Sequence, residues 1–159
     1  MAGLCFSCEI PTIQFECERT CVSGPQLTIY EIASYETGCP EWILRGLRFA
    51  ESSYGANVSH PDPLDVGDYG LHETPAYHAE RASKWGEYDP ENRLQAAIIA
   101  GRIIMENLHR SKSIDVSVSA YRRGMSGTRK NGIDREYVDK VKHGGKTYQS
   151  ETFKIAGDR

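Results

Sequence analysis

The sequence predicts a mostly α-helical domain of the α+β class, with one small loop or hairpin region between its helices. Apolar residues recur at intervals of three and four in several segments, whereas residues 54–74 are rich in Gly, Pro, Asp and Asn and lack that period. The length of 159 residues suits one compact domain. We divide the chain into a cysteine-bearing N-terminal arm (1–25), a main domain (26–145) and a polar C-terminal tail (146–159).

Four of the five cysteines, Cys5, Cys8, Cys17 and Cys21, lie in the N-terminal arm. Two disulfide bonds, free thiols or a tetrahedral zinc site would each explain this crowding, and disulfides are the favoured interpretation. The odd number leaves at least one thiol unpaired in a monomer, which we expect to be Cys39. The first residues show neither a basic segment nor an apolar stretch, so no secretory signal is visible.

Helix boundaries are predicted from capping residues. Gly38 is typical of the end of a first helix, and Pro40 of the start of a second helix that ends at Glu51. Residues 54–74 should then form a loop with one short hairpin. A third, short helix is expected to run from Pro75 through Lys84 and to stop at Gly86.

The fourth helix is expected to be the central buried one. Asp89 would cap it, Pro90 would occupy its first turn, and Asn92 would lie beside the cap. Its predicted inward-facing residues are Leu94, Ala97, Ile98, Gly101, Ile104, Met105 and Leu108.

Two further helices complete the predicted domain. Ser113 caps one that breaks within residues 122–127. Asp134 starts the other, with Tyr137, Val138 and Val141 facing inward, and it is expected to end at Gly144-Gly145. The tail beyond residue 145 is expected to form a short strand or to fray.

The charge is unevenly distributed along the chain. The net charge of −3 argues against a protein that coats nucleic acid, and no apolar run is long enough for a membrane span. Residues 110–146 nevertheless carry ten basic and four acidic residues, a local balance of +6. This region is either a surface that attracts an acidic polymer or the solvated outer side of late helices.

Glu51 occupies a position where a general acid is easily made, the end of an apolar helix that faces a polar loop. Partial burial raises the pKa of a carboxyl group, so its proton stays available near neutral pH. The loop adds Asp62, Asp65 and Asp68, which could stabilise a developing cation or position a water molecule.

We expect no metal ion and no cofactor in the main domain. His60, His72 and His78 form no recognised ligand spacing with the nearby acidic residues.

A series of short motifs follows in order along residues 40–142. They are Ala50-Glu51-Ser52-Ser53-Tyr54, Ser59, Asp68-Tyr69-Gly70-Leu71-His72-Glu73, Asn92 with Gly101, Ala120-Tyr121-Arg122-Arg123-Gly124, and Tyr137-Val138. Their order and spacing resemble those of the lytic transglycosylases. The resemblance implies a lysozyme-like fold with a central buried helix.

The resemblance also implies a reaction and a set of roles. Glu51 would be the catalytic acid/base that protonates the β-1,4 glycosidic oxygen between N-acetylmuramic acid and N-acetylglucosamine in peptidoglycan. The 6-hydroxyl of the sugar would then attack the anomeric carbon and give a 1,6-anhydro product. The implied substrate-binding residues are Ser59, Gly70, Leu71, Glu73, Tyr121 and Tyr137. The implied partner is the peptidoglycan glycan strand. The resemblance also implies a monomer that acts in the periplasm or outside the cell.

Some positions depart from the family's pattern. His72 and Glu73 stand where the family usually has Met and Gln, and Arg122-Arg123 replaces the common Asn-Ala. Glu73 and Arg122-Arg123 motivate one alternative, a non-catalytic glycan-binding module of the same fold.

Asp68 motivates a second alternative, a lysozyme-type hydrolase (muramidase). It follows Glu51 by 17 residues in an Asp-Tyr-Gly context that resembles c-type lysozymes, where a second carboxylate acts as nucleophile. Asp68 is also a typical turn residue that hydrogen-bonds its own backbone. Similarly, Tyr121 and Tyr137 could pack in the core or at its rim instead of lining a cleft.

Overall fold

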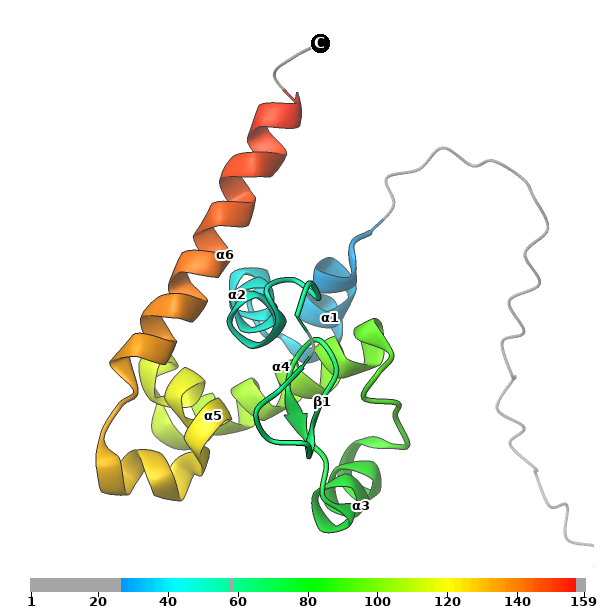
Figure 1. Ribbon diagram of the computed structural model, residues 1–159, viewed down its shortest axis with the longest axis vertical. Coiled ribbons are helices and arrows are strands. Elements are labelled where there is room, and N and C mark those ends of the chain that lie inside the picture. The colour runs from blue at the N-terminus through cyan, green and yellow to red at the C-terminus, as the bar shows by residue number, and fades with distance from the viewer. Residues whose placement is uncertain (1–26, 58, 157–159) are drawn as a thin grey trace, which may run out of the picture.

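The computed structural model describes residues 27–57 and 59–156 and confirms the mostly α-helical class with one small sheet (Figure 1). The elements, in chain order, are α1 (Ile29–Thr37), α2 (Glu41–Ser52), β1 (Asp65–Val66), β2 (Leu71–His72), α3 (Pro75–Trp85), α4 (Arg93–Ser111), α5 (Ile114–Asn131) and α6 (Arg135–Ala156). The N-terminal arm and its cysteines lie outside the described residues. Cys39 is buried and free, as the sequence predicts.

Local sequence signals set the first helix boundaries as expected. α1 begins with a capping box formed by Thr28 and Glu31, and it ends at Gly38 in the left-handed conformation. α2 follows Pro40 and carries Glu51 in its last turn. The predicted catalytic carboxylate therefore lies at a helix end, directly before the polar loop.

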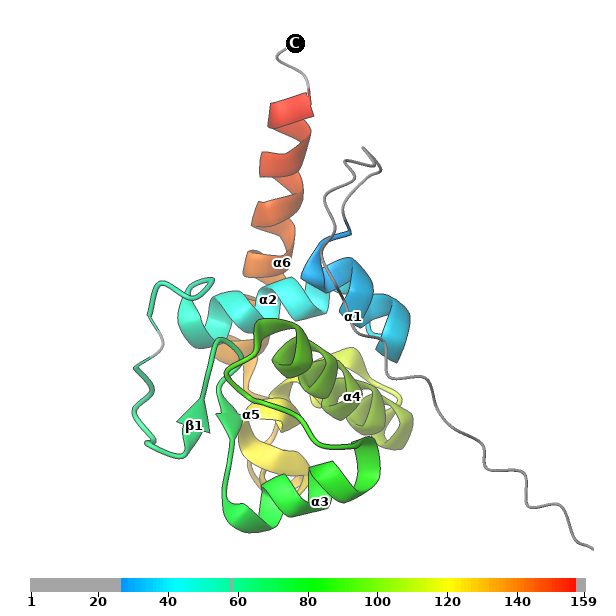
Figure 2. The same cartoon turned by 90° about the vertical axis from the view of Figure 1, so that its right-hand side faces the viewer.

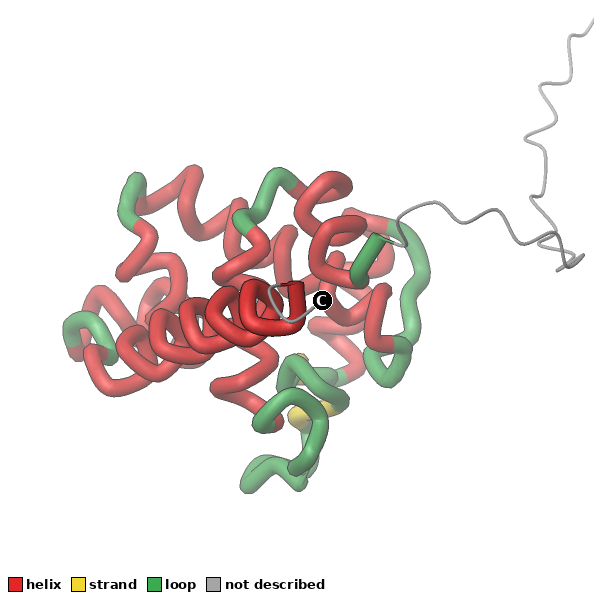
Figure 3. The backbone as a smooth tube through the Cα atoms, turned by 90° about the horizontal axis from the view of Figure 1, so that it is seen from above, coloured by secondary structure: helices red, strands yellow, loops and turns green. Residues whose placement is uncertain are grey.

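The predicted loop contains the predicted hairpin. β1 and β2 are antiparallel, with Asp65 opposite His72 and Val66 opposite Leu71. Viewed from above, this loop and its strands lie at one edge of the helical body (Figure 3). The hairpin is thus positioned to cover one side of the helices, next to the end of α2.

α4 begins later than predicted. Asn92, not Asp89, is its N-cap, because the Asn92 side-chain oxygen accepts the N–H groups of Leu94 and Gln95. Asp89 accepts the N–H of Glu91 in the preceding turn, at 2.9 Å. Both residue types favour N-cap positions, so local propensity alone does not choose between them.

α4 is the central helix, and its buried face is wider than predicted. Of the predicted inward residues, Ala97, Gly101 and Ile104 are buried and the others are partly buried. α4 packs against both α1 and α5, which explains the wider face. The further buried residues of this helix are Ala96, Ile99, Ala100 and Asn107.

α5 contains the break predicted within residues 122–127. Gly124 has a non-helical backbone conformation (φ 71°, ψ 159°), which glycine adopts without strain. The chain then returns to helix up to Asn131, a continuation that the sequence pattern does not indicate.

α6 continues past its predicted end. Gly144 and Gly145 lie inside the helix, which extends to Ala156, so the predicted strand or frayed segment is wrong over this range. A Cβ atom at Gly144 would lie 2.5 Å from the Cβ of Phe49, and one at Gly145 would lie 2.4 Å from the carbonyl oxygen of Trp42. These glycines therefore allow α6 to approach α2 closely and do not end the helix (Figure 2).

Gly46→Ala is expected to destabilise the protein by about 1–3 kcal/mol, measured by urea denaturation. A Cβ at Gly46 would lie 2.0 Å from the carbonyl oxygen of Val141 on α6, so the two helices would have to separate. The control is Gly127→Ala on α5, where the nearest atom is the Cβ of Arg123 at 3.3 Å. The control should change stability by less than about 1 kcal/mol. Equal stability of both variants would contradict the close approach of α2 and α6.

Within residues 27–57 and 59–156, no helix combines the length and apolar character needed to cross a membrane. This finding agrees with the expectation that the chain has no membrane span.

Candidate active site

Glu51 lies where the end of α2, the hairpin turn and α6 meet. Its carboxylate accepts a hydrogen bond from the hydroxyl of Tyr137 on α6. A Cβ at Gly70 would lie 2.7 Å from Glu51 Oε2 and 3.3 Å from His60 Cε1, so the turn backbone lies against the carboxylate. The structure thus brings together Glu51, Gly70 and Tyr137, three of the residues singled out by the sequence.

The pKa of Glu51 is raised, chiefly because burial disfavours its charged form. The hydrogen bond from Tyr137 and the positive charges of His60 and Arg122 act in the opposite direction, while the negative charge of Asp65 raises the pKa further. Since the net change is upward, the carboxyl group keeps its proton to a higher pH than an ordinary glutamate, which is the direction that favours a general acid.

The two predicted cleft tyrosines fix the positions of Glu51 and of the hairpin. Tyr137 is 4% exposed and belongs to the hydrophobic core, with its hydroxyl directed at Glu51. Tyr121 donates its hydroxyl to the carbonyl oxygen of Tyr69 at 2.8 Å. Burial raises the pKa of both Tyr121 and Tyr137 well above the usual value, and the charge of Glu51 adds to this effect. Both hydroxyls therefore remain hydrogen-bond donors.

Gly70 and Leu71 form the turn and the start of β2. Gly70 has a positive φ of 55°, where a side chain would be strained as well as too close to Glu51. The Leu71 side chain is 1% exposed and packs in the core, so it does not line an open cleft. Ser59 is exposed in the loop, and its N–H donates to Asn57 Oδ1 at 3.2 Å.

Asp68 is held by two arginines. Its Oδ2 atom lies 2.8 Å from Nε and 2.7 Å from Nη2 of Arg48, and 3.3 Å from Nε of Arg93. The residue is only 8% exposed. These contacts tie the hairpin turn to α2 and to the start of α4, so they give Asp68 a structural task whether or not it reacts with substrate.

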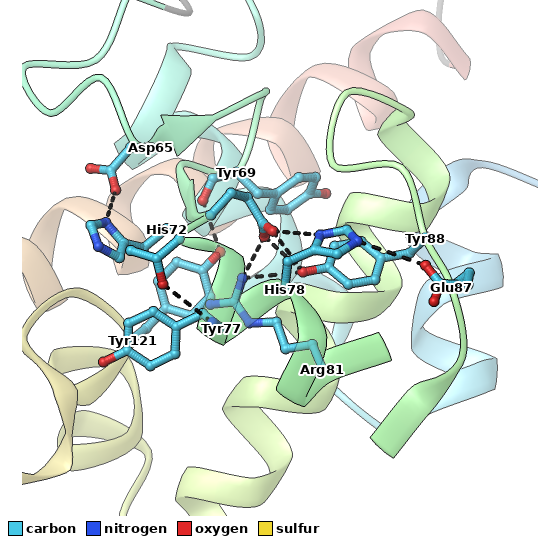
Figure 4. Close-up of polar contacts among 11 residues, drawn as sticks. Asp65, Tyr69, His72, Tyr77, His78, Arg81, Glu87, Tyr88 and Tyr121 are labelled. Carbon is cyan, nitrogen blue, oxygen red and sulfur yellow. Dashed lines mark hydrogen bonds and ion pairs between the residues drawn. The ribbon is translucent and has the colours of Figure 1, made fainter. Parts of the chain in front are cut away.

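Glu73 is also engaged inside the protein, and Figure 4 labels three of its partners, His78, Arg81 and Tyr88. Its side chain is 8% exposed and pairs with Arg81 and with His78 Nδ1, the latter at 2.9 Å. The Tyr88 hydroxyl lies 2.8 and 2.9 Å from the two carboxylate oxygens. Glu73 therefore connects β2 to α3 and to the segment after α3, and its predicted contact with substrate would compete with these partners.

Three residues near Glu51 received no definite role from the sequence. His60 lies beside the turn, with Nε2 2.8 Å from the carbonyl oxygen of Gly67. The guanidinium of Arg122 lies over the ring of Tyr137, 5.4 Å from its centre. Asp65, which the sequence offered only as one of three loop aspartates, is an acidic residue whose charge raises the pKa of Glu51. His60 and Asp65 lie in the loop, which has no period, and Arg122 lies on α5, so no shared local signal singles out the three residues.

A groove of about 710 Å³ lies on the α3 side of the molecule and includes Glu73, His78 and Glu87 in its lining. Glu51 is not among its lining residues. The candidate site is therefore identified by the chemistry around Glu51 and not by the volume of this groove.

Comparisons of the chain with protein-family models, with curated proteins and with solved structures found no match.

Proposed function

We propose that this chain is a peptidoglycan lytic transglycosylase with a lysozyme-like fold, in which Glu51 acts first as general acid and then as general base. The observation that carries the proposal is the setting of the Glu51 carboxyl group. It is partly buried, has a raised pKa, lies against the Gly70 turn and accepts the hydroxyl of Tyr137. A carboxyl group in such a setting can donate a proton to the β-1,4 glycosidic oxygen between N-acetylmuramic acid and N-acetylglucosamine.

In the proposed reaction Glu51 gives one proton to the leaving group and takes another from the attacking hydroxyl. Glu51 protonates the leaving glycosidic oxygen and becomes a carboxylate, which the Tyr137 hydroxyl stabilises. That carboxylate then takes the proton of the muramic acid 6-hydroxyl as its oxygen attacks the anomeric carbon, which gives the 1,6-anhydro product. One carboxylate is sufficient for this route, which is consistent with the binding of Asp68 to Arg48 and Arg93.

The basic region at 110–146 supports an acidic glycan polymer as substrate. Several of its cations are neutralised, since Arg123 pairs with Asp134 at 2.9 Å and Lys142 pairs with Asp115 at 2.7 Å. Ten basic against four acidic residues still leave an excess of +6. Arg122 shares Asp134 with Arg123 and lies over the ring of Tyr137, so this pair of cations brings excess positive charge close to Glu51. Action in the periplasm or outside the cell follows from this proposed substrate.

The contacts of the acidic and basic residues bear on both alternatives, the hydrolase and the glycan-binding module. A hydrolase would need a second carboxylate or a positioned water. Asp68 is held by Arg48 and Arg93, whereas Asp65 is bound by no arginine among the ion pairs of the described residues and its charge raises the pKa of Glu51, so Asp65 is the better candidate for that task. The departures that suggest a glycan-binding module have structural partners, since Glu73 pairs with Arg81. Arg122 and Arg123 both pair with Asp134. Such internal contacts explain the departures without a loss of catalysis.

The proposed function is tested by incubating the full chain with dye-labelled, purified peptidoglycan sacculi, with an active lysozyme as positive control. The expected result is release of soluble labelled fragments. Binding to the sacculi without release, under conditions where the lysozyme is active, would instead indicate the glycan-binding module.

Tyr137→Phe is expected to move the alkaline limb of the pH profile of kcat to higher pH. The Tyr137 hydroxyl lowers the pKa of Glu51, so its removal should raise that pKa and keep the acid protonated over a wider range. The maximal kcat should fall about tenfold, since the carboxylate formed in the first step loses one hydrogen bond. The matched control is Tyr35→Phe, at an exposed position of α1, which should leave the pH profile unchanged. An unshifted profile in Tyr137→Phe would contradict the proposed coupling.

A further inference from the structure

We propose that Asp62, Asp65 and His72 form a binding site for a divalent transition-metal ion of the zinc type on the outer side of the hairpin. The inference does not depend on the proposed function, and it departs from the absence of a metal site that the histidine spacing indicates. The three residues come from the loop before β1, from β1 and from β2. They are therefore separated along the chain and are brought together by the hairpin.

The donor atoms lie at separations suited to coordination by one ion. His72 Nδ1 is 2.8 Å from Asp65 Oδ1 and 3.8 Å from Asp62 Oδ2, and all three donor atoms lie within 4.8 Å of one another. In a tetrahedral zinc site with bonds of about 2.0–2.1 Å, neighbouring ligand atoms lie about 3.3–3.4 Å apart. The two separations from His72 Nδ1 lie on either side of that value, so side-chain rotations that shorten one and lengthen the other would give the geometry of a zinc site.

The charges around the cluster favour a cation. Among the ion pairs of the described residues, Asp62 and Asp65 pair with His72 alone. By contrast, the carboxylates of Asp68 and Glu73 are each held by at least one arginine. Two neighbouring carboxylates repel each other, and one imidazole compensates at most one negative charge. A divalent ion would neutralise both.

The backbone holds the three ligands in place before an ion binds. Asp65 and His72 are directly opposite in the β1–β2 pair. The turn before β1 fixes Asp62, because its carbonyl oxygen accepts the N–H of Asp65 at 3.1 Å and its Oδ1 accepts the N–H of Leu64 at 2.9 Å. The His72 ring also meets the edge of the Tyr77 ring, with centres 5.7 Å apart (Figure 4). Little ordering would therefore be needed on binding.

The ligand chemistry selects the class of ion. An imidazole nitrogen with two carboxylates suits zinc or a similar first-row metal, whereas magnesium and calcium favour all-oxygen sites. The ligand side chains are 29–48% exposed, so solvent or another ligand can complete the coordination. A bound ion would fasten the loop at residue 62 to β2, directly beyond the turn that lies against Glu51.

The test is isothermal titration of the full chain with zinc chloride after accessible thiols have been alkylated, because the cysteines of the N-terminal arm could also bind zinc. We expect one equivalent of zinc per chain in the alkylated wild type. His72→Ala and Asp62→Asn should weaken binding roughly tenfold or more. Asp62 is exposed, so its variant retains the fold even where His72→Ala does not. His109→Ala, at an exposed position of α4, is the matched control and should bind as the wild type does.

Nuclear magnetic resonance of the imidazole nitrogens supplies the second readout. Zinc should shift the Nδ1 signal of His72 and leave that of His109 in place. The proposal is overturned if the alkylated wild type binds no zinc, if Asp62→Asn and His72→Ala bind as tightly as the wild type, or if the shifted signal belongs to another histidine.

Discussion

Glu51→Gln is expected to reduce peptidoglycan cleavage by about 10²–10⁴-fold while the fold stays intact. Glutamine has nearly the same size and still accepts the Tyr137 hydroxyl, but it carries no acidic proton for the glycosidic oxygen. The measurement is fragment release from labelled sacculi per mole of folded protein. The matched control is Glu80→Gln at an exposed position of α3, which should retain the wild-type rate.

The same substitution should also leave the protein at least as stable as the wild type at neutral pH. Burial raises the pKa of Glu51 in the folded state above its unfolded value. The stability contributed by such a group is fully present below the unfolded pKa and is lost as pH rises through the folded pKa. Glutamine does not titrate, so its contribution to stability does not change with pH. The variant should therefore have the higher Tm at neutral pH, and the difference should shrink as the pH falls toward 4.5, the ordinary pKa of a glutamate. A variant markedly less stable at neutral pH would contradict the desolvated setting of Glu51.

Asp68→Asn is expected to lower the free energy of unfolding by about 3–5 kcal/mol, because it leaves the Arg48 guanidinium without its close counter-charge. The side chains of Asp68 and Arg48 are 9% and 13% exposed, so water replaces the lost partner poorly. Urea denaturation measures the loss. Asp65→Asn is the control, since the Asp65 side chain is more exposed and pairs with His72, and it should cost less than about 1 kcal/mol.

The kinetics of Asp68→Asn separate a structural role from that of a nucleophile. If Asp68 only ties the hairpin to α2 and α4, the folded fraction of the variant should keep its activity at low temperature. Complete loss of activity in fully folded Asp68→Asn would instead support the hydrolase. The double variant Arg48→Met with Asp68→Leu should recover much of the lost stability, because it removes both buried charges together.

The sequence was sufficient for those parts of the fold that local signals determine. Gly38 and Pro40 mark helix boundaries through their own backbone preferences, and these boundaries are found in the structure. The end of α6 could not be predicted in this way. The same residue type that ends one helix at Gly38 permits helix contact at Gly144 and Gly145, and only the position of α2 distinguishes the two uses.

The candidate site divides along the same line. The order and spacing of the short motifs were enough to single out Glu51, Gly70 and Tyr137, which the structure brings together. The sequence could not show that Asp68 and Glu73 are paired with arginines. Their partners lie 8 to 25 residues away and meet them only after the helices have packed. A carboxylate that is available for substrate therefore cannot be distinguished from a structural one before its partners are known.

The most direct test of the central claim is mass spectrometry of the fragments released from defined peptidoglycan by the wild type and by Glu51→Gln in parallel. The proposed reaction predicts fragments that end in 1,6-anhydro-N-acetylmuramic acid from the wild type and none above background from the variant. Fragments with reducing ends would contradict transglycosylation and favour hydrolysis. Equal release by both proteins would contradict the role of Glu51 itself.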